Sequence, residues 1–231
     1  MKVKGFQGTS LLDFPGRVAS LIFFGGCNLT CPFCHNPSLV LDPDQYPDYP
    51  REVLLEELKN RMPFIDGVVV SGGEPTIDPQ CINLLREIKA LGLAVKLDTN
   101  GLRPEMLQRM LDENLLDYLA FDLKTAPGRY GELHTSPVDL DQLQRSISII
   151  MKCNIDYEFR TTCVPAFVDE QVVRQMGAAI NGAERWAFQQ FMPEHSLDAE
   201  LREAAAYPDK MIRNFAEIGK EYAREVLLRG V

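Results

Sequence analysis

The sequence "VASLIFFGGCNLTCPFCHN" (residues 18–36) joins an apolar run to three cysteines and a histidine. Its first part, residues 18–26, is nearly continuous in apolar side chains and has the length of a buried strand. Strands covered on both faces have this composition, because neither face meets water. Cys27, Cys31 and Cys34 follow directly, and His35 comes next. Thiols this closely spaced are unlike a disulfide framework and indicate a metal site at the end of a strand.

The composition is that of an ordinary globular protein. The chain has 231 residues, 45% of them hydrophobic and 25% charged, with a formal net charge of -9. This acidity argues against a broad nucleic-acid surface or an anionic membrane surface, which would need a basic face. The N-terminus "MKVKGFQGTS" lacks the pattern of a signal peptide, and no run of 18 apolar residues predicts a membrane span. We therefore expect a cytoplasmic protein with reduced thiols.

Apolar strand patterns alternate with helical patterns along the whole chain. We expect strands at 18–26, 67–73, 94–101, 118–124, 156–165 and 185–193, and helices at 51–62, 79–92, 103–115, 139–153, 169–180 and from about Pro208 to the end, including "EYAREVLLRG". Regular alternation implies right-handed crossovers and a parallel sheet. The prediction is an α/β fold, a partial (β/α)6 barrel of parallel strands with outer helices, in a single domain spanning 1–231. A flat doubly wound sheet is the alternative.

Unusual polar residues fall at the expected carboxyl ends of these strands. In a parallel α/β sheet that edge carries the chemistry, so we expect these side chains to line one rim. They are the cysteines, Ser71-Gly72-Gly73-Glu74-Pro75, Asp98-Thr99-Asn100-Gly101, Asp122-Leu123-Lys124, Arg160 and Glu194-His195.

These motifs resemble a known family. The pattern Cys27-x3-Cys31-x2-Cys34, with Phe33 before the last cysteine, is similar to the signature of radical S-adenosylmethionine (SAM) enzymes, and the Gly-Gly-Glu-Pro segment 72–75 is similar to their SAM-binding motif. The stretches "TSLLDFPGRVASLIFFGGCNLTCPFCHNP" and "DTNG…DLK" narrow the resemblance to the activating enzymes of glycyl-radical enzymes, nearest in pattern to the activators of anaerobic ribonucleoside-triphosphate reductase. The similarity runs from about Gly5 to His195.

The resemblance implies a [4Fe-4S] cluster held by Cys27, Cys31 and Cys34, with SAM bound to the fourth iron. Reductive cleavage of SAM would give methionine and a 5′-deoxyadenosyl radical, which takes hydrogen from a glycine of the partner. The implied partner is a glycyl-radical enzyme, anaerobic ribonucleotide reductase in the nearest case. The implied electron donor is a flavodoxin or ferredoxin type, and neither nucleic acid nor membrane is a partner.

The resemblance also assigns roles to the rim residues. The SAM-binding positions are Phe33, Gly72, Gly73, Glu74, Asp98, Lys124, Arg160 and His195. A monovalent cation beside SAM is implied at Asp98, Thr99 and Asp122, where oxygen ligands suit a hard cation. The structural alternatives are a local turn for Glu74, a strand-end cap for Asp98, an ion pair of Lys124 or Arg160 with Asp122 or Glu158, and an exposed loop position for His195.

Other interpretations stay open at this point. The cysteines with His35 could form a structural zinc site, although His35 directly follows Cys34 and is awkwardly placed for it; otherwise it is a hydrogen-bond donor beside the cluster. A radical SAM enzyme acting on a small molecule, such as a 7-carboxy-7-deazaguanine synthase-like enzyme, is the alternative function. We expect Cys81, Cys153 and Cys163 to be unreactive packing residues. We expect the loop 125–138 to be a solvated connection; contact of Arg129 and Tyr130 with the partner protein is the alternative.

Overall fold

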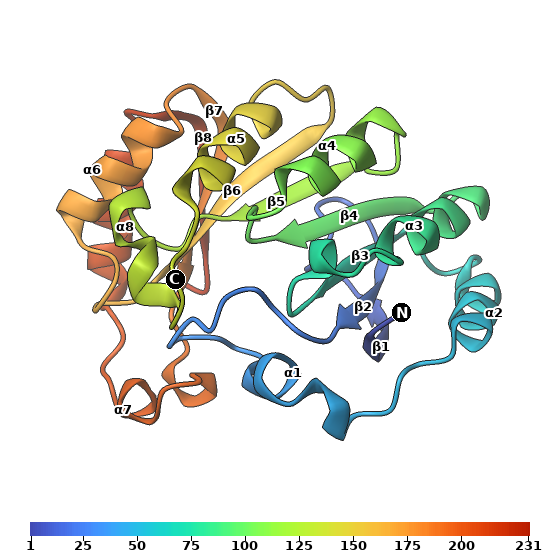
Figure 1. The fold of residues 1–231 in the computed structure, drawn as a ribbon. Coiled ribbons are helices and arrows are strands. Elements are labelled where there is room, and N and C mark those ends of the chain that lie inside the picture. Colours follow the sequence, from blue (N-terminus) through green and yellow to red (C-terminus); the bar gives the residue numbers. More distant parts are fainter. The chain divides into compact units, whose positions relative to one another are not determined.

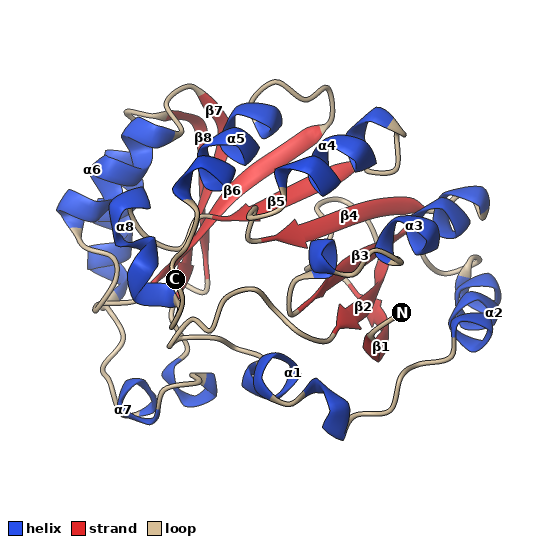
Figure 2. Cartoon of the chain, viewed as in Figure 1, coloured by secondary structure: helices blue, strands red, loops and turns tan.

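The computed structural model describes residues 1–231 and has an α/β fold (Figures 1 and 2). Eight strands form a mostly parallel sheet in the order β1-β2-β3-β4-β5-β6-β7-β8. The strands are β1 (Val3–Ser10), β2 (Ala19–Phe24), β3 (Gly67–Gly72), β4 (Ala94–Thr99), β5 (Tyr118–Asp122), β6 (Asp156–Cys163), β7 (Ala183–Gln190) and β8 (Ala223–Arg229).

The α-helices are α1 (Pro37–Leu41), α2 (Arg51–Arg61), α3 (Cys81–Ala90), α4 (Pro104–Asp112), α5 (Leu140–Ile150), α6 (Glu170–Ala179), α7 (Ala199–Arg202) and α8 (Asp209–Gly219). Four short 3₁₀ helices occur in the connections: η1 (Pro43–Gln45), η2 (Pro75–Ile77), η3 (Pro127–Leu133) and η4 (Pro193–His195). The chain forms two compact units: unit 1 comprises residues 1–28, 38–99 and 105–119, and unit 2 comprises 29–37, 100–104 and 120–231.

Unit 1 contains a hairpin and two further parallel strands. Strand β1 pairs with β2 in antiparallel fashion, and β2, β3 and β4 are mutually parallel neighbours. The β2–β3 register extends to the pair Phe24↔Gly72, whereas the β3–β4 register extends to Val70↔Leu97. Because consecutive strands are parallel, their carboxyl ends lie at the same edge, and the cysteine motif begins there.

Unit 2 is built on three neighbouring parallel strands, β6, β7 and β8. Helix α8 packs against β7 and β8, and Gly219 at its end lies directly on the Phe188 ring, where a Cβ would collide. Trp186 is fully buried, and its indole N–H donates to the Thr161 hydroxyl at 3.0 Å. On β6, the carboxylate of Glu158 is 1% exposed and accepts two hydrogen bonds from Arg229, at 2.9 and 2.7 Å. This bidentate pair ties β8 to β6 and neutralises a buried charge.

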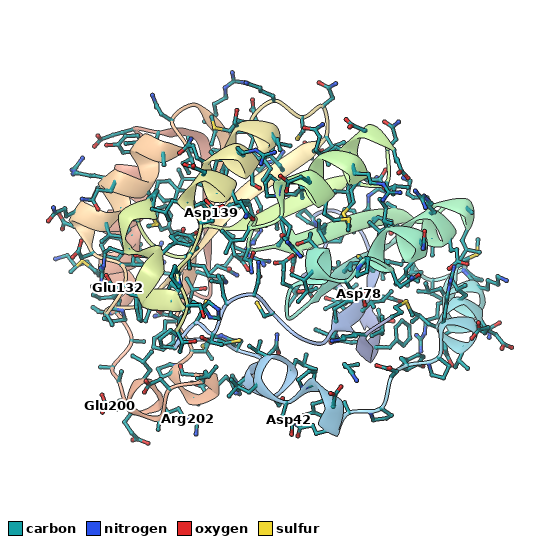
Figure 3. The ribbon with its side chains drawn as sticks, viewed as in Figure 1. Asp42, Asp78, Glu132, Asp139, Glu200 and Arg202 are labelled. Carbon is teal, nitrogen blue, oxygen red and sulfur yellow. The ribbon has the colours of Figure 1, made fainter.

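Short acidic side chains start several helices. Asp139 accepts from the Asp141 backbone N–H at 3.0 Å before α5, and Asp169 accepts from Val172 N–H at 2.8 Å before α6. Asp78 serves the turn into α3 in the same way and also binds the Lys2 N–H at 2.7 Å (Figure 3). Such caps satisfy amide groups that have no partner inside the helix.

The six predicted β/α units are confirmed, and with them the α/β class of parallel strands with outer helices. Two strands escaped prediction. The sequence near the C-terminus, expected to be helical throughout, is helical only to Gly219 and then forms β8. Its helix-forming Ala, Glu, Leu and Arg residues are overridden by pairing with β7, since strand formation depends on neighbours more than on propensity. The other missed strand, β1, is the antiparallel edge beside β2.

No helix in the structure combines the length and the apolar character needed to cross a membrane.

Candidate functional site

In unit 1, the Gly-Gly-Glu turn after β3 is hydrogen-bonded to the backbone that leads into the cysteine motif. The Gly73 N–H donates to the Phe24 carbonyl at 2.7 Å, and the Glu74 N–H donates to the Gly26 carbonyl at 2.8 Å. Gly26 directly precedes Cys27. The position of the first motif cysteine therefore depends on the turn after the neighbouring strand.

Both glycines of this turn are required by geometry. Gly72 has φ +113°, a backbone conformation that residues with a Cβ rarely adopt. A Cβ on Gly73 would collide with the carbonyl oxygen of Gly26, which is backbone and has little freedom to move. The Gly-Gly pair thus permits a close approach of two chain segments, as expected from the sequence.

Glu74 holds the turn in place. Its side chain is buried, and its Oε1 accepts hydrogen bonds from the Thr76 N–H at 3.1 Å, the Thr76 hydroxyl at 2.6 Å and the Thr99 hydroxyl at 2.9 Å. The first two contacts cap η2, and the third links the turn to the end of β4. Of the two interpretations of Glu74, the structure shows the local turn; a direct role toward a ligand stays a prediction.

The end of β4 carries an ion pair that the sequence reasoning missed. Lys96 and Asp98 are two residues apart on the strand, so their side chains leave the same face. The Lys96 ammonium contacts Asp98 Oδ1, and the Ser71 hydroxyl donates to Asp98 Oδ2 at 3.2 Å. The signal in the sequence was a lysine inside the apolar run "AVKL", where a charge needs a buried partner.

In unit 2, Cys31 and Cys34 lie in one tight turn. The Cys34 N–H donates to the Cys31 carbonyl at 2.9 Å. Burial raises the pKa of the Cys31 thiol to about 11, an effect that the nearby Lys124 ammonium opposes. Burial also raises the pKa of the Cys34 thiol, and Lys124 again acts in the opposite direction. The two thiols therefore share one cationic neighbour.

The loop 125–138 supports this cysteine turn. The Thr30 N–H donates to the Leu133 carbonyl at 3.3 Å, and the Thr30 hydroxyl lies 3.0 Å from His134 Nδ1. On the other side of the turn, the Asp198 N–H donates to the Pro32 carbonyl at 2.8 Å. The Phe33 ring packs on Phe167, with ring centroids 5.2 Å apart.

The expectation that 125–138 is a solvated connection is wrong for Tyr130. Tyr130 is fully buried within η3, and its hydroxyl accepts a hydrogen bond from the Lys124 N–H at 3.1 Å. The sequence around Tyr130 shows no hydrophobic periodicity that would have indicated burial. The reason is that η3 is a short 3₁₀ helix, and so few residues cannot establish a repeating pattern.

Asp122, Lys124 and Arg160 form a charged group, in which Asp122 ends β5, Lys124 follows that strand and Arg160 lies within β6. Arg160 Nε donates to Asp122 Oδ1 at 2.6 Å, and Lys124 Nζ lies 3.5 Å from Asp122 Oδ2. Glu158, the other candidate partner for Arg160, is paired with Arg229 instead. Two cations on one carboxylate give the group a net charge of +1, which favours an anionic ligand.

His35 and His195 face each other in unit 2, with ring centroids 5.6 Å apart and ring planes inclined at 56°. Burial lowers the pKa of His35, and His195 acts in the same direction. His195 is more than half exposed. His195 thus has the exposed position that the structural alternative predicted. Its ring neighbour is His35, the residue that follows Cys34.

The remaining cysteines behave as packing residues. Cys81 and Cys163 are buried, and burial raises the pKa of both thiols, that of Cys163 to about 12. Burial raises the pKa of the half-buried Cys153 as well.

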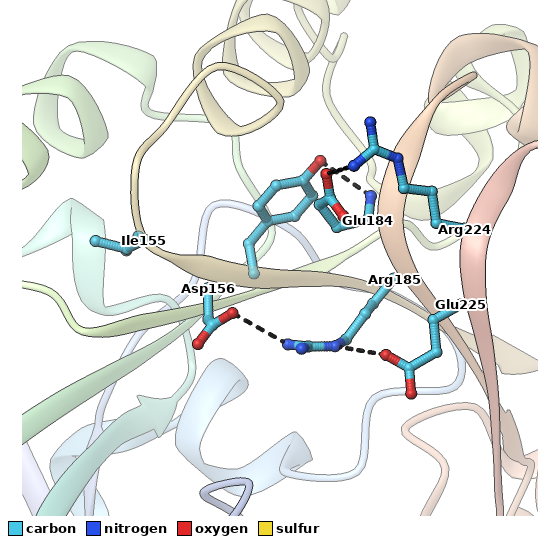
Figure 4. Close-up of a pocket in the computed structure, with 7 residues that line it drawn as sticks. Ile155, Asp156, Glu184, Arg185, Arg224 and Glu225 are labelled. Carbon is cyan, nitrogen blue, oxygen red and sulfur yellow. Dashed lines mark hydrogen bonds and ion pairs between the residues drawn. The ribbon is translucent and has the colours of Figure 1, made fainter.

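A cavity of about 320 Å³ in unit 2 lies at the amino ends of β6, β7 and β8 (Figure 4). Its charged side chains are paired with one another: Arg185 with Glu225 at 2.8 Å and with Asp156 at 3.5 Å, and Arg224 with Glu184 at 2.7 Å. In a parallel sheet this edge carries stability and not chemistry.

The donor set fits an iron–sulfur cluster. Three thiols in one motif are soft ligands that suit iron–sulfur clusters or zinc, and only three cysteines have this spacing. His35, the fourth ligand that a zinc site would need, has the His195 ring as its neighbour. The structure places Cys31 and Cys34 in one turn of unit 2 and Cys27 in unit 1, so a cluster held by all three stays a prediction from their spacing in the sequence.

Comparison with known proteins identifies the family. The sequence model of the Radical SAM superfamily matches residues 21–176, which include all three motif cysteines, the Gly-Gly-Glu turn, Asp98, Asp122 and Arg160. This chain belongs to the radical SAM superfamily.

Two curated relatives differ in how much of the chain they match. A protein of Methanocaldococcus jannaschii, named provisionally as a glycyl-radical enzyme activating enzyme, is 32% identical over 99% of this chain and 96% of its own length. The 7-carboxy-7-deazaguanine synthase of Hyperthermus butylicus is 35% identical over 54% of this chain and 53% of its own length.

Among solved structures, SuiB of Streptococcus suis bound to S-adenosylmethionine superimposes with a TM-score of 0.66 and 15% sequence identity, covering 91% of this chain and 52% of SuiB. The chain thus spans about half the length of SuiB. At this identity the likeness establishes the fold.

Proposed function

We propose that this radical SAM enzyme is a glycyl-radical enzyme activase, built as a single domain over residues 1–231, with anaerobic ribonucleotide reductase as its partner. The observation that carries the proposal is the relative named as an activating enzyme, which aligns with 99% of this chain at 32% identity. The alignment also covers 96% of the relative's own length. The partner is proposed from the motif pattern "DTNG…DLK" together with the cysteine stretch.

In this proposal, Cys27, Cys31 and Cys34 hold a [4Fe-4S] cluster. The chemistry that the bound cluster supplies is one-electron reduction of SAM, which breaks a C–S bond and gives methionine and the 5′-deoxyadenosyl radical. The chain's residues place and shield these groups. Cys31 is buried, so the ligand turn excludes water on one side, and Thr30 fixes the turn against the loop 125–138.

The charged group of unit 2 suits the carboxylate of SAM. Asp122, Lys124 and Arg160 together carry one net positive charge, and their side chains are 28%, 21% and 15% exposed. Partial burial strengthens the attraction for an anion relative to a solvated surface. Asp122 keeps the two cations oriented, because each contacts a different oxygen of its carboxylate.

The turn of unit 1 suits the amino group of SAM. Pairing of β3 with β4 extends to Val70, while pairing with β2 extends two residues further, to Gly72. Gly72 has no side chain that would keep a ligand away from the end of β3. Glu74 maintains this geometry through Thr76 and Thr99. His195 and Phe33 complete the proposed SAM contacts, and a flavodoxin- or ferredoxin-type protein is the proposed electron donor.

The test is activation of a partner. Anaerobically reconstituted protein, reduced and mixed with SAM and anaerobic ribonucleotide reductase, should produce a glycine-centred EPR doublet on the reductase. The Cys31→Ala variant is the matched control and should give no doublet. If the wild-type protein cleaves SAM but gives no glycyl radical with the reductase or with other glycyl-radical enzymes, the activase proposal fails.

A second candidate function rests on the match to 7-carboxy-7-deazaguanine synthase over 54% of this chain. Formation of 7-carboxy-7-deazaguanine by the reconstituted protein, in the absence of any partner protein, would favour it over the activase.

A further inference from the structure

Lys96 is a basic side chain placed inside unit 1. It is 1% exposed, in the middle of β4, between the apolar residues Val95 and Leu97. Its ammonium contacts Asp98 Oδ1 and lies 6.0 Å from the centre of the Tyr118 ring. A lysine is rarely buried unless it is paired, because removing its charge from water is costly. The ion pair with Asp98 offsets part of this desolvation cost.

The same Asp98 is a residue at which the family resemblance implies a monovalent cation. Its Oδ1 is taken by the Lys96 ammonium, and its Oδ2 accepts from the Ser71 hydroxyl at 3.2 Å. Thr99, the second implied ligand, donates its hydroxyl proton to Glu74 at 2.9 Å. A metal cation at Asp98 would share one carboxylate with the Lys96 ammonium. Two positive charges bound to the same carboxylate repel each other strongly in a buried site.

The third implied ligand, Asp122, is also balanced by cations of the chain. Arg160 Nε contacts its Oδ1 at 2.6 Å, and Lys124 Nζ lies 3.5 Å from its Oδ2. Each aspartate of the implied cation site therefore has a protein cation on it, within its own unit. These residues do not fit a metal cation.

We propose that the Lys96 ammonium takes the place of the monovalent cation at Asp98, so that this enzyme binds SAM without potassium or sodium. Lys96 is a positioning residue: it holds the Asp98 carboxylate and supplies the positive charge that a dissolved ion would otherwise bring. A tethered ammonium is present at full occupancy, whatever the salt composition. The proposal rests on the SAM site of the proposed function and does not depend on the partner.

The test compares cation dependence in three proteins. SAM affinity is measured by anaerobic calorimetry at equal ionic strength, with tetramethylammonium, sodium or potassium as the only added cation. Wild-type affinity should agree within about twofold among the three salts. Lys96→Met, which keeps an unbranched side chain one atom shorter and removes its charge, should bind SAM at least about tenfold more weakly in tetramethylammonium and recover in potassium or sodium. Lys89→Met removes another ion pair of unit 1, Lys89 with Asp117 at 2.7 Å, and should show no cation dependence.

A second measurement needs neither SAM nor the cluster. Thallium(I), a potassium substitute, is titrated into the protein and followed by ²⁰⁵Tl NMR line broadening. Lys96→Met should show saturable binding, and wild type should show none. If Lys96→Met does not fold, wild type alone still decides, because saturable thallium binding or a tenfold gain in SAM affinity from potassium would overturn the proposal. Failure of wild type to bind SAM would reject the proposed site, while the thallium result would still report on Lys96.

Discussion

The contact between Gly73 and Gly26 makes one substitution especially informative. In Gly73→Ala, the new Cβ would meet the carbonyl oxygen of Gly26, so one of the two segments has to move. Two hydrogen bonds depend on the present spacing: Gly73 N–H to Phe24 O at 2.7 Å and Glu74 N–H to Gly26 O at 2.8 Å. Because Gly26 precedes Cys27, the displacement reaches the first motif cysteine.

The size of the effect follows from these contacts. Losing two backbone hydrogen bonds costs about 1 kcal/mol each, and forcing a methyl group against rigid backbone costs roughly 1–3 kcal/mol more. The free energy of unfolding should therefore fall by about 3–5 kcal/mol, a large share of the stability of a typical domain.

Urea denaturation of the apo protein measures this loss, and iron content per chain after reconstitution measures the effect on the cysteine motif. Gly131→Ala is the matched control, since no heavy atom lies within 4 Å of the added Cβ. It should leave stability unchanged within about 0.5 kcal/mol. If Gly73→Ala matches this control in stability and in iron content, the close approach does not position Cys27 as described.

Cys31→Ala should lose iron and SAM cleavage while keeping the far-UV spectrum of the folded protein; 5′-deoxyadenosine formation by this variant would contradict the ligand assignment. Arg160→Ala should weaken SAM binding by about 1–3 kcal/mol, because Lys124 and the Asp122 carboxylate together have no net positive charge. An unchanged Kd in calorimetry would mean that Arg160 has only a structural role. Tyr130→Phe should lower the free energy of unfolding by about 1 kcal/mol, since the Lys124 N–H loses its acceptor, and equal urea midpoints would contradict this. Because burial raises the pKa of Cys163 to about 12, its alkylation rate should still rise steeply from pH 9 to pH 10, where the rate of an ordinary thiol levels off; mass spectrometry showing a rate that levels off near pH 9 would mean that burial does not control this thiol.

The sequence was most informative where burial leaves a regular pattern. Strands such as β3, with "GVVV", are apolar on both faces, and this alone distinguishes them from the amphipathic helices between them. Asp98 and Asp122 lie at the carboxyl ends of their strands as predicted, whereas Arg160 lies within β6. The Gly-Gly turn was also predictable, because only glycine allows φ +113° and a backbone contact at the neighbouring position.

Features that depend on long-range partners were not predictable. The final residues form β8 because β7 offers an edge, whereas their local composition favours a helix. Lys96 sits in the core because Asp98 and Tyr118 surround its charge, which the residue type alone would place at the surface. Thr30 and His134 are 104 positions apart, so no local pattern connects the loop 125–138 with the cysteine turn.

The Glu158–Arg229 pair has a consequence for the order in which the newly made chain folds. Arg229 lies on β8 and follows Glu158 by 71 positions, so a nascent chain in which β8 has not yet been made lacks the strand that brings this cation to β6. Until then the Glu158 carboxylate would be left in an apolar interior without its countercharge, which disfavours compaction of β6 and β7. Completion of unit 2 is therefore expected only once β8 has been made, and chains that end before Ala223 should be far more sensitive to protease than chains that include β8.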